Sequence, residues 1–133
     1  MMELSAPVRA FLEKPNLAVL VTVGPRGGPQ ATPVWFLVED GRILVNTSRG
    51  RVKLRNVRAN PEVVLTIVDR DNPYHYVQIF GRVTEIDPAR GARDIDRLSL
   101  RYRGKPYTYP PSDRPEWRHT ILIAPQRIDA HLR

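Results

Sequence analysis

The chain contains no cysteine, and only three histidines and three lysines among its 133 residues. Without cysteine there is neither a disulfide framework nor a thiolate metal site, and the histidines lie far apart without the spacing of metal ligands. No stretch reaches the roughly 18 to 20 apolar residues of a membrane-spanning helix. The first residues also lack the charged and apolar regions of a signal peptide. We therefore expect a cytoplasmic protein without a metal site.

Sequence motifs of several common enzyme classes are missing as well. There is no G-x-S-x-G sequence, no P-loop and no Rossmann glycine pattern. The glycines within residues 24–28 are typical of a hairpin turn and not of a phosphate-binding loop. Asp94 and Asp96 are predicted to lie on a solvated helix surface. No paired carboxylates in the context of a pocket are therefore expected.

The composition is that of one globular domain spanning residues 1–133. Hydrophobic residues make up 41% of the chain, which is typical of a folded protein, and the length is close to the commonest domain size. The formal net charge is +7, and arginine supplies most of the positive charge. A basic surface favours anionic partners such as nucleic acids, acidic cofactors or membrane headgroups.

Short β-prone runs separated by turn residues dominate the chain. They predict strands at residues 17–23, 30–38, 42–47, 63–68, 74–86, 119–124 and 128–132. Helices are expected at residues 5–12, 52–59 and 87–103. Strands of this number and length, joined by short turns, indicate a mostly β protein with short helices. Its sheet should form an antiparallel barrel and not be built from βαβ units.

Three features of this pattern lead to further expectations. Residues 17–23 are nearly all apolar, so both faces of that strand should be covered. Pro33, inside the second strand, indicates a sheet edge, a bulge or a backbone exposed for a ligand. Residues 104–115 form a proline-rich loop that is long enough to be functional. Its aromatic rim could belong to a substrate lid or to a plain packed loop.

The most informative stretch is residues 46–56, where a predicted strand end, a turn and a helix start follow one another. It carries four cations, Arg49, Arg51, Lys53 and Arg55. The first N–H groups of a helix have no partner within the helix, and the helix dipole is positive there, so an anion is stabilised by both. Arginine adds a planar fork of donors that matches phosphate or carboxylate oxygens. An anion site is expected here, with a solvated basic helix as the alternative.

Four segments in this order resemble the pyridoxamine 5′-phosphate oxidase-like split β-barrel superfamily, and most of all its small deazaflavin (coenzyme F420)-dependent reductases. These segments are residues 17–23, 29–36, 43–56 and 71–83. The resemblance implies a split antiparallel β-barrel of the FMN-binding type and a homodimer with two cofactor sites at the subunit interface. It also implies hydride transfer between bound coenzyme F420 and a small organic acceptor.

The same resemblance implies which residues bind the cofactor. They are Pro33, Val34, Trp35, Val45, Asn46, Thr47, Ser48, Arg51, Lys53, Arg55, Tyr76 and Gln78. Pro33, Val34 and Trp35 would lend backbone groups to the ring system, and Val45, Asn46 and Thr47 would flank it. The Trp35 side chain could form a wall beside the ring or be an aromatic of the core or of the dimer interface. Arg51 and Lys53 would hold the phosphate, with the hydroxyl groups of Thr47 and Ser48 nearby.

The remaining assignments concern the ends of the cofactor. Arg49 and Arg55 would meet the acidic oligoglutamate tail of a deazaflavin, a tail that FMN lacks. Tyr76 and Gln78 would approach the ring from the partner subunit or pack within the barrel. No residue stands out as a proton donor, and both a solvent proton and a tyrosine are admissible.

The chain departs from the pattern of the oxidases themselves. It has Ala31 and Phe36 where they have an arginine and a lysine, and residues 127–131 match their substrate-binding segment only loosely. Pyridoxamine phosphate is therefore not the expected substrate. FMN stays open as the cofactor because it would use the same phosphate pocket, and so does a carrier that binds a deazaflavin without turnover. Nucleic-acid binding is disfavoured, since the basic residues are spread along the chain and no RNA- or DNA-reading motif is present.

Overall fold

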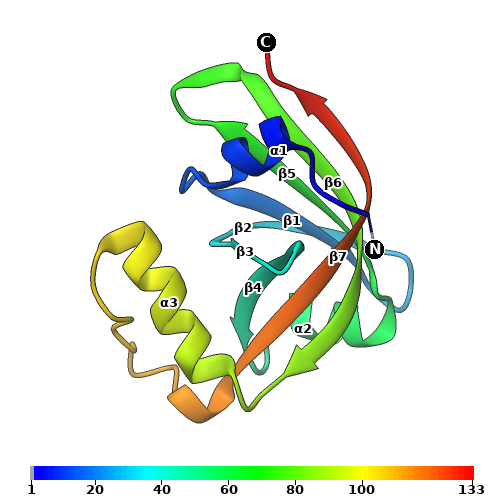
Figure 1. Ribbon diagram of the computed structural model, residues 1–133. Helices are drawn as coiled ribbons and strands as arrows, with labels where there is room; N and C mark the ends of the chain where they lie inside the picture. Colours follow the sequence, from blue (N-terminus) through cyan, green and yellow to red (C-terminus); the bar gives the residue numbers. More distant parts are fainter. Residues whose placement is uncertain (1) are drawn as a thin grey trace.

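The computed structural model describes residues 2–133, which form one seven-stranded antiparallel sheet curled around a core (Figure 1). Along the chain the elements are α1 (Ala6–Leu12), β1 (Ala18–Val23), β2 (Pro29–Val34), β3 (Leu37–Glu39), β4 (Arg42–Ser48), α2 (Val52–Ala59), β5 (Glu62–Asp69), β6 (Asn72–Asp87), α3 (Gly91–Arg103), the 3-10 helix η1 (Pro115–Trp117) and β7 (Arg118–His131). Across the sheet the strands follow the order β2-β1-β5-β6-β7-β4-β3. The predicted fold class, a mostly β split barrel with short helices, is confirmed.

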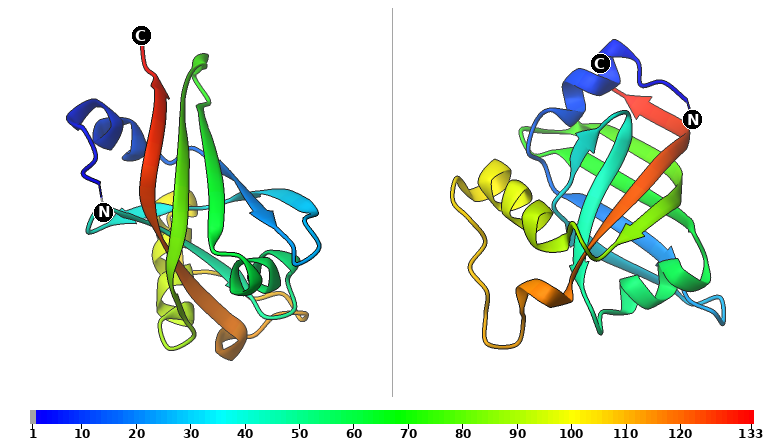
Figure 2. Two further views of the ribbon diagram at one scale, coloured as in Figure 1. Left: turned by 90° about the vertical axis from the view of Figure 1, so that its right-hand side faces the viewer. Right: turned by 60° about the horizontal axis from the view of Figure 1, so that its bottom comes forward.

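The two longest strands bend the sheet into a barrel. β6 has 16 residues and β7 has 14, and they pair along most of their length. Their register shifts between Phe80 and Gly81 and again between Val83 and Glu85, and such bulges sharpen the bend of a strand. A side chain at Gly81 would bring its Cβ within 2.6 Å of the Ile123 side chain, so the strands approach closely there. α1 and α2 lie near opposite ends of the barrel, and α3 stands beside it (Figure 2).

The barrel is split because its two edge strands, β2 and β3, do not pair with each other within residues 2–133. β2 ends at Val34, and only Trp35 and Phe36 carry the chain from that edge of the sheet to β3 at the other. The prediction of one strand over residues 30–38 is therefore wrong. Phe36 is fully buried, so the chain turns into the core at this point and leaves the sheet. Pro33 does lie on an edge strand, where proline is tolerated.

The C-terminal part forms one strand where two were predicted. Residues 119–124 and 128–132 were expected to be separate, but β7 runs continuously through Pro125. Pro125 lies opposite Gly81 at the bulge, where the pairing is already irregular. A residue without an N–H group is tolerated at such a position.

β1 is covered on one face only. Its side chains alternate between buried and partly or fully exposed, with Ala18, Leu20 and Thr22 inside the barrel. Val19 is 39% exposed and Leu17, just before the strand, is 53% exposed. The expectation that both faces are covered is therefore not met within this chain. An apolar strand with one bare face calls for a covering partner.

α3 begins at Gly91, later than the predicted helix, and docks closely on β7. A Cβ at Gly91 would lie 1.9 Å from the carbonyl oxygen of Arg118, so only glycine permits this approach. Further along α3, Ile95 and Leu98 face a small second core cluster. Within residues 2–133, no helix combines the length and the hydropathy needed to cross a bilayer.

Asp94 on α3 is fully buried, so the prediction that it lies on a solvated surface is wrong. Its carboxylate accepts hydrogen bonds from Thr120 Oγ1 at 2.7 Å and from Arg97 Nη1 at 2.8 Å. Burial raises the pKa of this carboxyl, but these hydrogen bonds and the nearby guanidinium groups outweigh burial and hold the pKa below its usual value. Asp94 therefore ties α3 to β7 and positions the Ile95 and Leu98 side chains.

Candidate functional site

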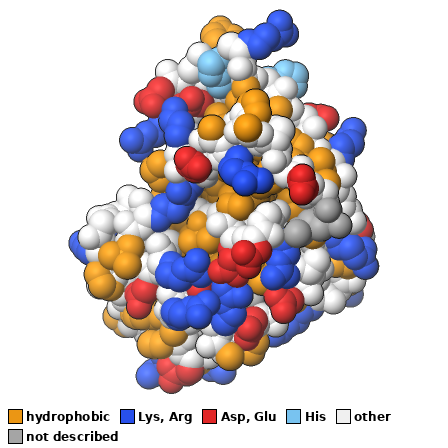
Figure 3. Space-filling model, in the orientation of Figure 1, with side chains coloured by type: hydrophobic (Ala, Val, Ile, Leu, Met, Phe, Trp, Pro, Cys, Tyr) orange, Lys and Arg blue, Asp and Glu red, His pale blue; other side chains and the backbone are white. Residues whose placement is uncertain are grey.

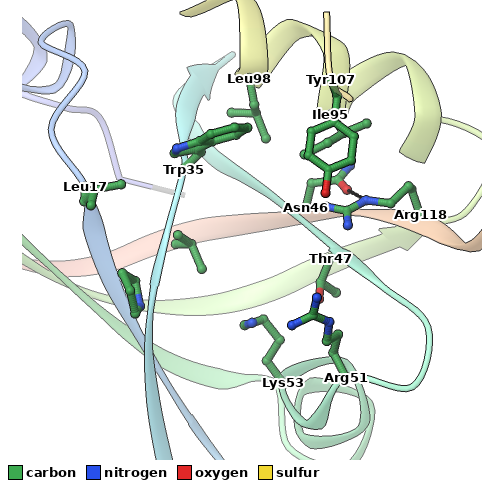
Figure 4. Close-up of a pocket in the computed structure, with 12 residues that line it drawn as sticks. Leu17, Trp35, Asn46, Thr47, Arg51, Lys53, Ile95, Leu98, Tyr107 and Arg118 are labelled. Carbon is green, nitrogen blue, oxygen red and sulfur yellow. Dashed lines mark hydrogen bonds between the residues drawn. The ribbon is translucent and has the colours of Figure 1, made fainter. Parts of the chain in front are cut away.

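A pocket of about 390 Å³ lies at the split of the barrel, and its size is within the range of small-molecule sites. It is lined by Leu17, Pro33, Val34, Trp35, Asn46, Thr47, Arg51, Lys53, Ile95, Leu98, Tyr107 and Arg118. These residues come from the end of β2, the end of β4, the start of α2, the inner face of α3, the proline-rich loop and the start of β7. Figure 4 shows Thr47, Arg51 and Lys53 at one end, with Trp35, Leu98 and Tyr107 at the other.

The cationic end of the pocket is built by the start of α2. Arg51 occupies the N-cap position in an extended conformation, and no side chain caps the helix. Lys53 follows in the first turn and is half-buried. Burial lowers the pKa of the Lys53 ammonium group, and repulsion from Arg51 and Arg118 lowers it further. A phosphate placed here would meet free backbone N–H groups, a favourable helix dipole and two cations together.

Neither Arg51 nor Lys53 forms an ion pair within residues 2–133, where seven of the 21 lysines and arginines do. A half-buried ammonium group without a carboxylate partner is unusual, because burial disfavours its charged form. Such groups are most simply explained by an anionic ligand that supplies the missing charge. The signs of the charges at this end of the pocket therefore fit a phosphate.

Arg118 is the third cation, and it is held rigidly by its own partners. Its side chain is only 8% exposed, and Nη1 donates to Asp113 Oδ2 at 2.9 Å. Nε donates to Asn46 Oδ1, also at 2.9 Å, as the dashed line in Figure 4 shows. Asp113 also accepts a hydrogen bond from Ser48 Oγ at 2.6 Å. Because Asp113 neutralises Arg118, the charge left for a ligand comes from Arg51 and Lys53.

The other end of the pocket is apolar and aromatic. Trp35 stacks on Tyr102, with ring centroids 5.5 Å apart, and Tyr107 meets Trp35 edge-on at 6.4 Å. Ile95 and Leu98 complete this wall from α3. β2 pairs with β1 on one side only, so the backbone beside the pocket keeps unpaired polar groups. A flat heteroaromatic ring would find both an apolar surface and hydrogen-bonding backbone here.

The structure brings together seven of the residues assigned from the resemblance: Pro33, Val34, Trp35, Asn46, Thr47, Arg51 and Lys53. Val45 instead lies fully buried in the core. The Ser48 hydroxyl is committed to Asp113 and does not reach the pocket. Arg55 lies on another side of α2, where it lines a separate groove with Arg26. These three residues are therefore not at the pocket of this chain.

Tyr76 and Gln78 lie on β6, outside the pocket of their own chain. Tyr76 stacks on His131 with centroids 4.3 Å apart, and Gln78 Nε2 donates to Thr66 Oγ1 at 3.3 Å. Both point to the outer face of the sheet, because Gln78 lies opposite Thr66, which lies opposite the exposed Val19. An approach to the ring of a partner subunit stays a prediction.

Arg118, Ile95 and Leu98 are pocket residues that the sequence did not reveal. Arg118 is one of 21 lysines and arginines in the chain, and nothing local distinguishes it from the exposed ones. Ile95 and Leu98 lie on one apolar stripe of the predicted helix, but such a stripe does not show what it packs against. Tyr107 was recognised only as part of the aromatic rim of the loop.

Comparison with known proteins identifies relatives. Residues 4–132 match the family described as pyridoxamine 5′-phosphate oxidase. A solved structure named F420 reductase is 34% identical, with a TM-score of 0.81, over 91% of this chain and 94% of its own. A conserved hypothetical protein from Mycobacterium tuberculosis is 26% identical, with a TM-score of 0.73, over 98% of this chain and 86% of its own. The chain matches no curated protein.

A third solved structure is a protein from Listeria innocua provisionally named a pyridoxamine 5′-phosphate oxidase. It is 25% identical, with a TM-score of 0.68, over 91% of this chain and 92% of its own. The family and the F420 reductase together point to a flavin or a deazaflavin as the class of cofactor. The chain belongs to the pyridoxamine 5′-phosphate oxidase-like family of split β-barrel proteins and, within it, to the branch of the F420 reductase.

Proposed function

We propose that the protein is an F420-dependent reductase that transfers hydride between a bound deazaflavin and a small organic acceptor. The observation that carries this proposal is the two-ended pocket. Arg51 and Lys53, which form no ion pair within residues 2–133, lie at a helix start and form one end. The apolar and aromatic surface around Trp35 forms the other end. The 34% identity with the F420 reductase structure supports a deazaflavin as the occupant.

The residues of the pocket divide the work of holding the cofactor. Arg51, Lys53 and the first N–H groups of α2 bind the phosphate, and Thr47 offers its hydroxyl beside them. Residues 33–35 would hold the ring through their backbone groups, and Ile95 and Leu98 would exclude water from this end of the pocket. The deazaflavin itself supplies the hydride. The protein contributes position and a dry surface, and no side chain is required as a nucleophile.

The acidic tail of a deazaflavin is proposed to leave the pocket over α2. Arg55 faces a groove between α2 and the β1–β2 hairpin, and Arg26 lines the same groove. Arg49 lies on the other side of the helix start, with its guanidinium 4.3 Å from the centroid of the Trp117 ring. Within residues 2–133 neither Arg26 nor Arg55 forms an ion pair, so the two would favour an oligoglutamate chain over FMN, which lacks this tail.

The active form is proposed to be a homodimer. Leu17, Val19 and Val68 leave an apolar band bare on the outer face of β1 and β5. Leu17 also lines the pocket, so a second copy seated on this band would close the open side of the site. Tyr76 and Gln78 border the same band from β6. In the proposed dimer they would approach the partner's cofactor.

Two alternative functions would use the same pocket, and a third, nucleic-acid binding, would not. FMN would fill the phosphate end equally well, and a carrier would bind the deazaflavin without passing on its hydride. A nucleic-acid role would require a continuous basic surface. On the face shown in Figure 3, the basic side chains are interspersed with acidic and apolar ones, so that face offers no such surface.

The proposed reaction can be tested by anaerobic turnover. Protein loaded with reduced deazaflavin is mixed with small uncharged or aromatic acceptors that carry an activated double bond, and the absorbance of the oxidised deazaflavin is followed. We expect oxidation that depends on both the protein and the acceptor. If only reduced FMN supports turnover, the cofactor is FMN and not a deazaflavin. If the protein binds the deazaflavin tightly but no acceptor oxidises it, the protein is a carrier.

A further inference from the structure

The crossing between the two sheet edges is anchored by the last turns of α3. Trp35 and Phe36 leave the sheet here, so the polar backbone groups of Phe36 need other partners. Its N–H donates to Tyr102 Oη at 3.2 Å, and its carbonyl oxygen accepts from Arg101 Nε at 2.9 Å. Two neighbouring residues of α3 therefore satisfy both backbone groups of Phe36.

The same two residues tie this crossing to the end of α1. Tyr102 Oη donates to the carbonyl oxygen of Asn16 at 2.7 Å. The Arg101 guanidinium donates to the carbonyl oxygens of Leu12, Glu13 and Lys14, at distances from 2.8 to 3.0 Å. One arginine thus serves four carbonyls, including those at the C-terminal end of α1, where a cation is also favoured by the helix dipole.

Tyr102 does more than hold the backbone. Its ring stacks on Trp35 at an interplanar angle of 14°, although Tyr102 itself does not line the pocket. Trp35 lines the pocket, and its backbone is bonded directly to that of Phe36, so hydrogen bonds that hold Phe36 also restrict Trp35. One side chain therefore controls both the backbone next to Trp35 and the ring of Trp35.

We propose that Tyr102 is a positioning residue that holds residues 33–35 in place as the ring-binding wall, with Arg101 supporting it. This inference rests on the proposed function for its effect on the cofactor, but the placement of Trp35 can be tested without any cofactor. The phosphate end is built by α2 and β4, and within residues 2–133 the hydroxyl of Tyr102 forms hydrogen bonds only with the backbone of Phe36 and Asn16. Loss of its hydroxyl will therefore affect the ring end of the pocket selectively.

The test variant is Tyr102→Phe, which keeps the stacked ring and removes only the hydroxyl. The matched control is Tyr109→Phe. Tyr109 lies in the neighbouring aromatic cluster, 4.9 Å from Tyr107, and its hydroxyl makes no hydrogen bond within residues 2–133. Both substitutions are made in a Trp117→Phe background, so that the tryptophan emission, excited selectively over that of tyrosine, comes from Trp35 alone.

In the cofactor-free protein, Tyr102→Phe is expected to raise the acrylamide quenching of Trp35 about twofold, because a loosened indole is more often open to solvent. Its dissociation constant for the deazaflavin should rise about 10-fold, since two buried backbone groups lose their partner. Affinity for inorganic phosphate should stay within about twofold of the parent, because that end lies elsewhere. Tyr109→Phe should change none of the three values.

Unchanged quenching would overturn the proposal, and so would an equal loss of deazaflavin and phosphate affinity, which indicates general destabilisation. Thermal melts accompany both variants. If Tyr102→Phe does not fold, Arg101→Lys repeats the test, since it keeps the charge but loses the planar fork that reaches four carbonyls. A parent protein that binds no deazaflavin would contradict the proposed function, while the quenching result would still decide the role of Tyr102.

Discussion

Replacing Arg51 and Lys53 together with alanine is expected to raise the dissociation constant of the deazaflavin about 100- to 10,000-fold. Each residue is assigned one charge-assisted hydrogen bond to the phosphate, and such a bond contributes about 1.5 to 3 kcal/mol. Each single variant should therefore weaken binding by about 10- to 100-fold. Fluorescence titration of the cofactor measures the effect, and thermal melts establish that the fold is intact.

Arg58→Ala is the control for nonspecific charge. Arg58 lies on the same helix, one turn beyond Arg55, but it lines a different groove and not the pocket. Its removal changes the net charge as much as removal of Arg51 does, and binding should be nearly unaffected. If Arg58→Ala weakens binding as much as Lys53→Ala, the effect is diffuse surface charge, and the phosphate site is misassigned.

The second large effect concerns the apolar band on β1. Val19→Asp places a carboxylate at the centre of the proposed dimer interface, and burial without a partner costs several kcal/mol. The dissociation constant of the dimer should rise by at least about 100-fold. Light scattering at micromolar concentration should then report the 15.2 kDa chain instead of twice that mass.

Leu100→Asp is the matched control for Val19→Asp. Leu100 is 52% exposed on α3 and is not part of the apolar band on β1 and β5. This variant should remain dimeric. A wild-type protein that is monomeric under the same conditions would contradict the proposed homodimer. A Val19→Asp variant that stays dimeric would contradict the proposed interface on β1.

The parts of the fold that the sequence predicted are those fixed by local chemistry. α2 has the bounds expected from the residues around it, Val52–Ala59. The turn between β3 and β4 has positive φ at both Asp40 and Gly41, the conformation that an Asp-Gly pair favours in a hairpin. At the site, Arg51 and Lys53 lie at the start of α2 and line the pocket, as the helix start and the resemblance led us to expect, and their phosphate-binding role stays a prediction.

The rest depends on contacts between distant segments. The sequence of residues 30–38 predicts one strand, but the strand ends at Val34. The backbone of Phe36 instead forms hydrogen bonds with Tyr102 and Arg101 of α3, which no local pattern shows. Asp94 resembles any helix-surface acid until β7 brings Thr120 against it. Arg118 reaches the pocket only because Asp113 and Asn46 hold it there. No local sequence pattern encodes such pairings.

The most direct test of the central claim is an equilibrium titration of the purified protein with coenzyme F420 and, separately, with FMN. The account predicts saturable binding of one deazaflavin per chain, tighter than that of FMN because of its tail, and a large loss of this binding in the Arg51/Lys53 double variant. Stoichiometric FMN binding without affinity for the deazaflavin would contradict the cofactor assignment. Deazaflavin binding that is undiminished in the double variant would contradict the site.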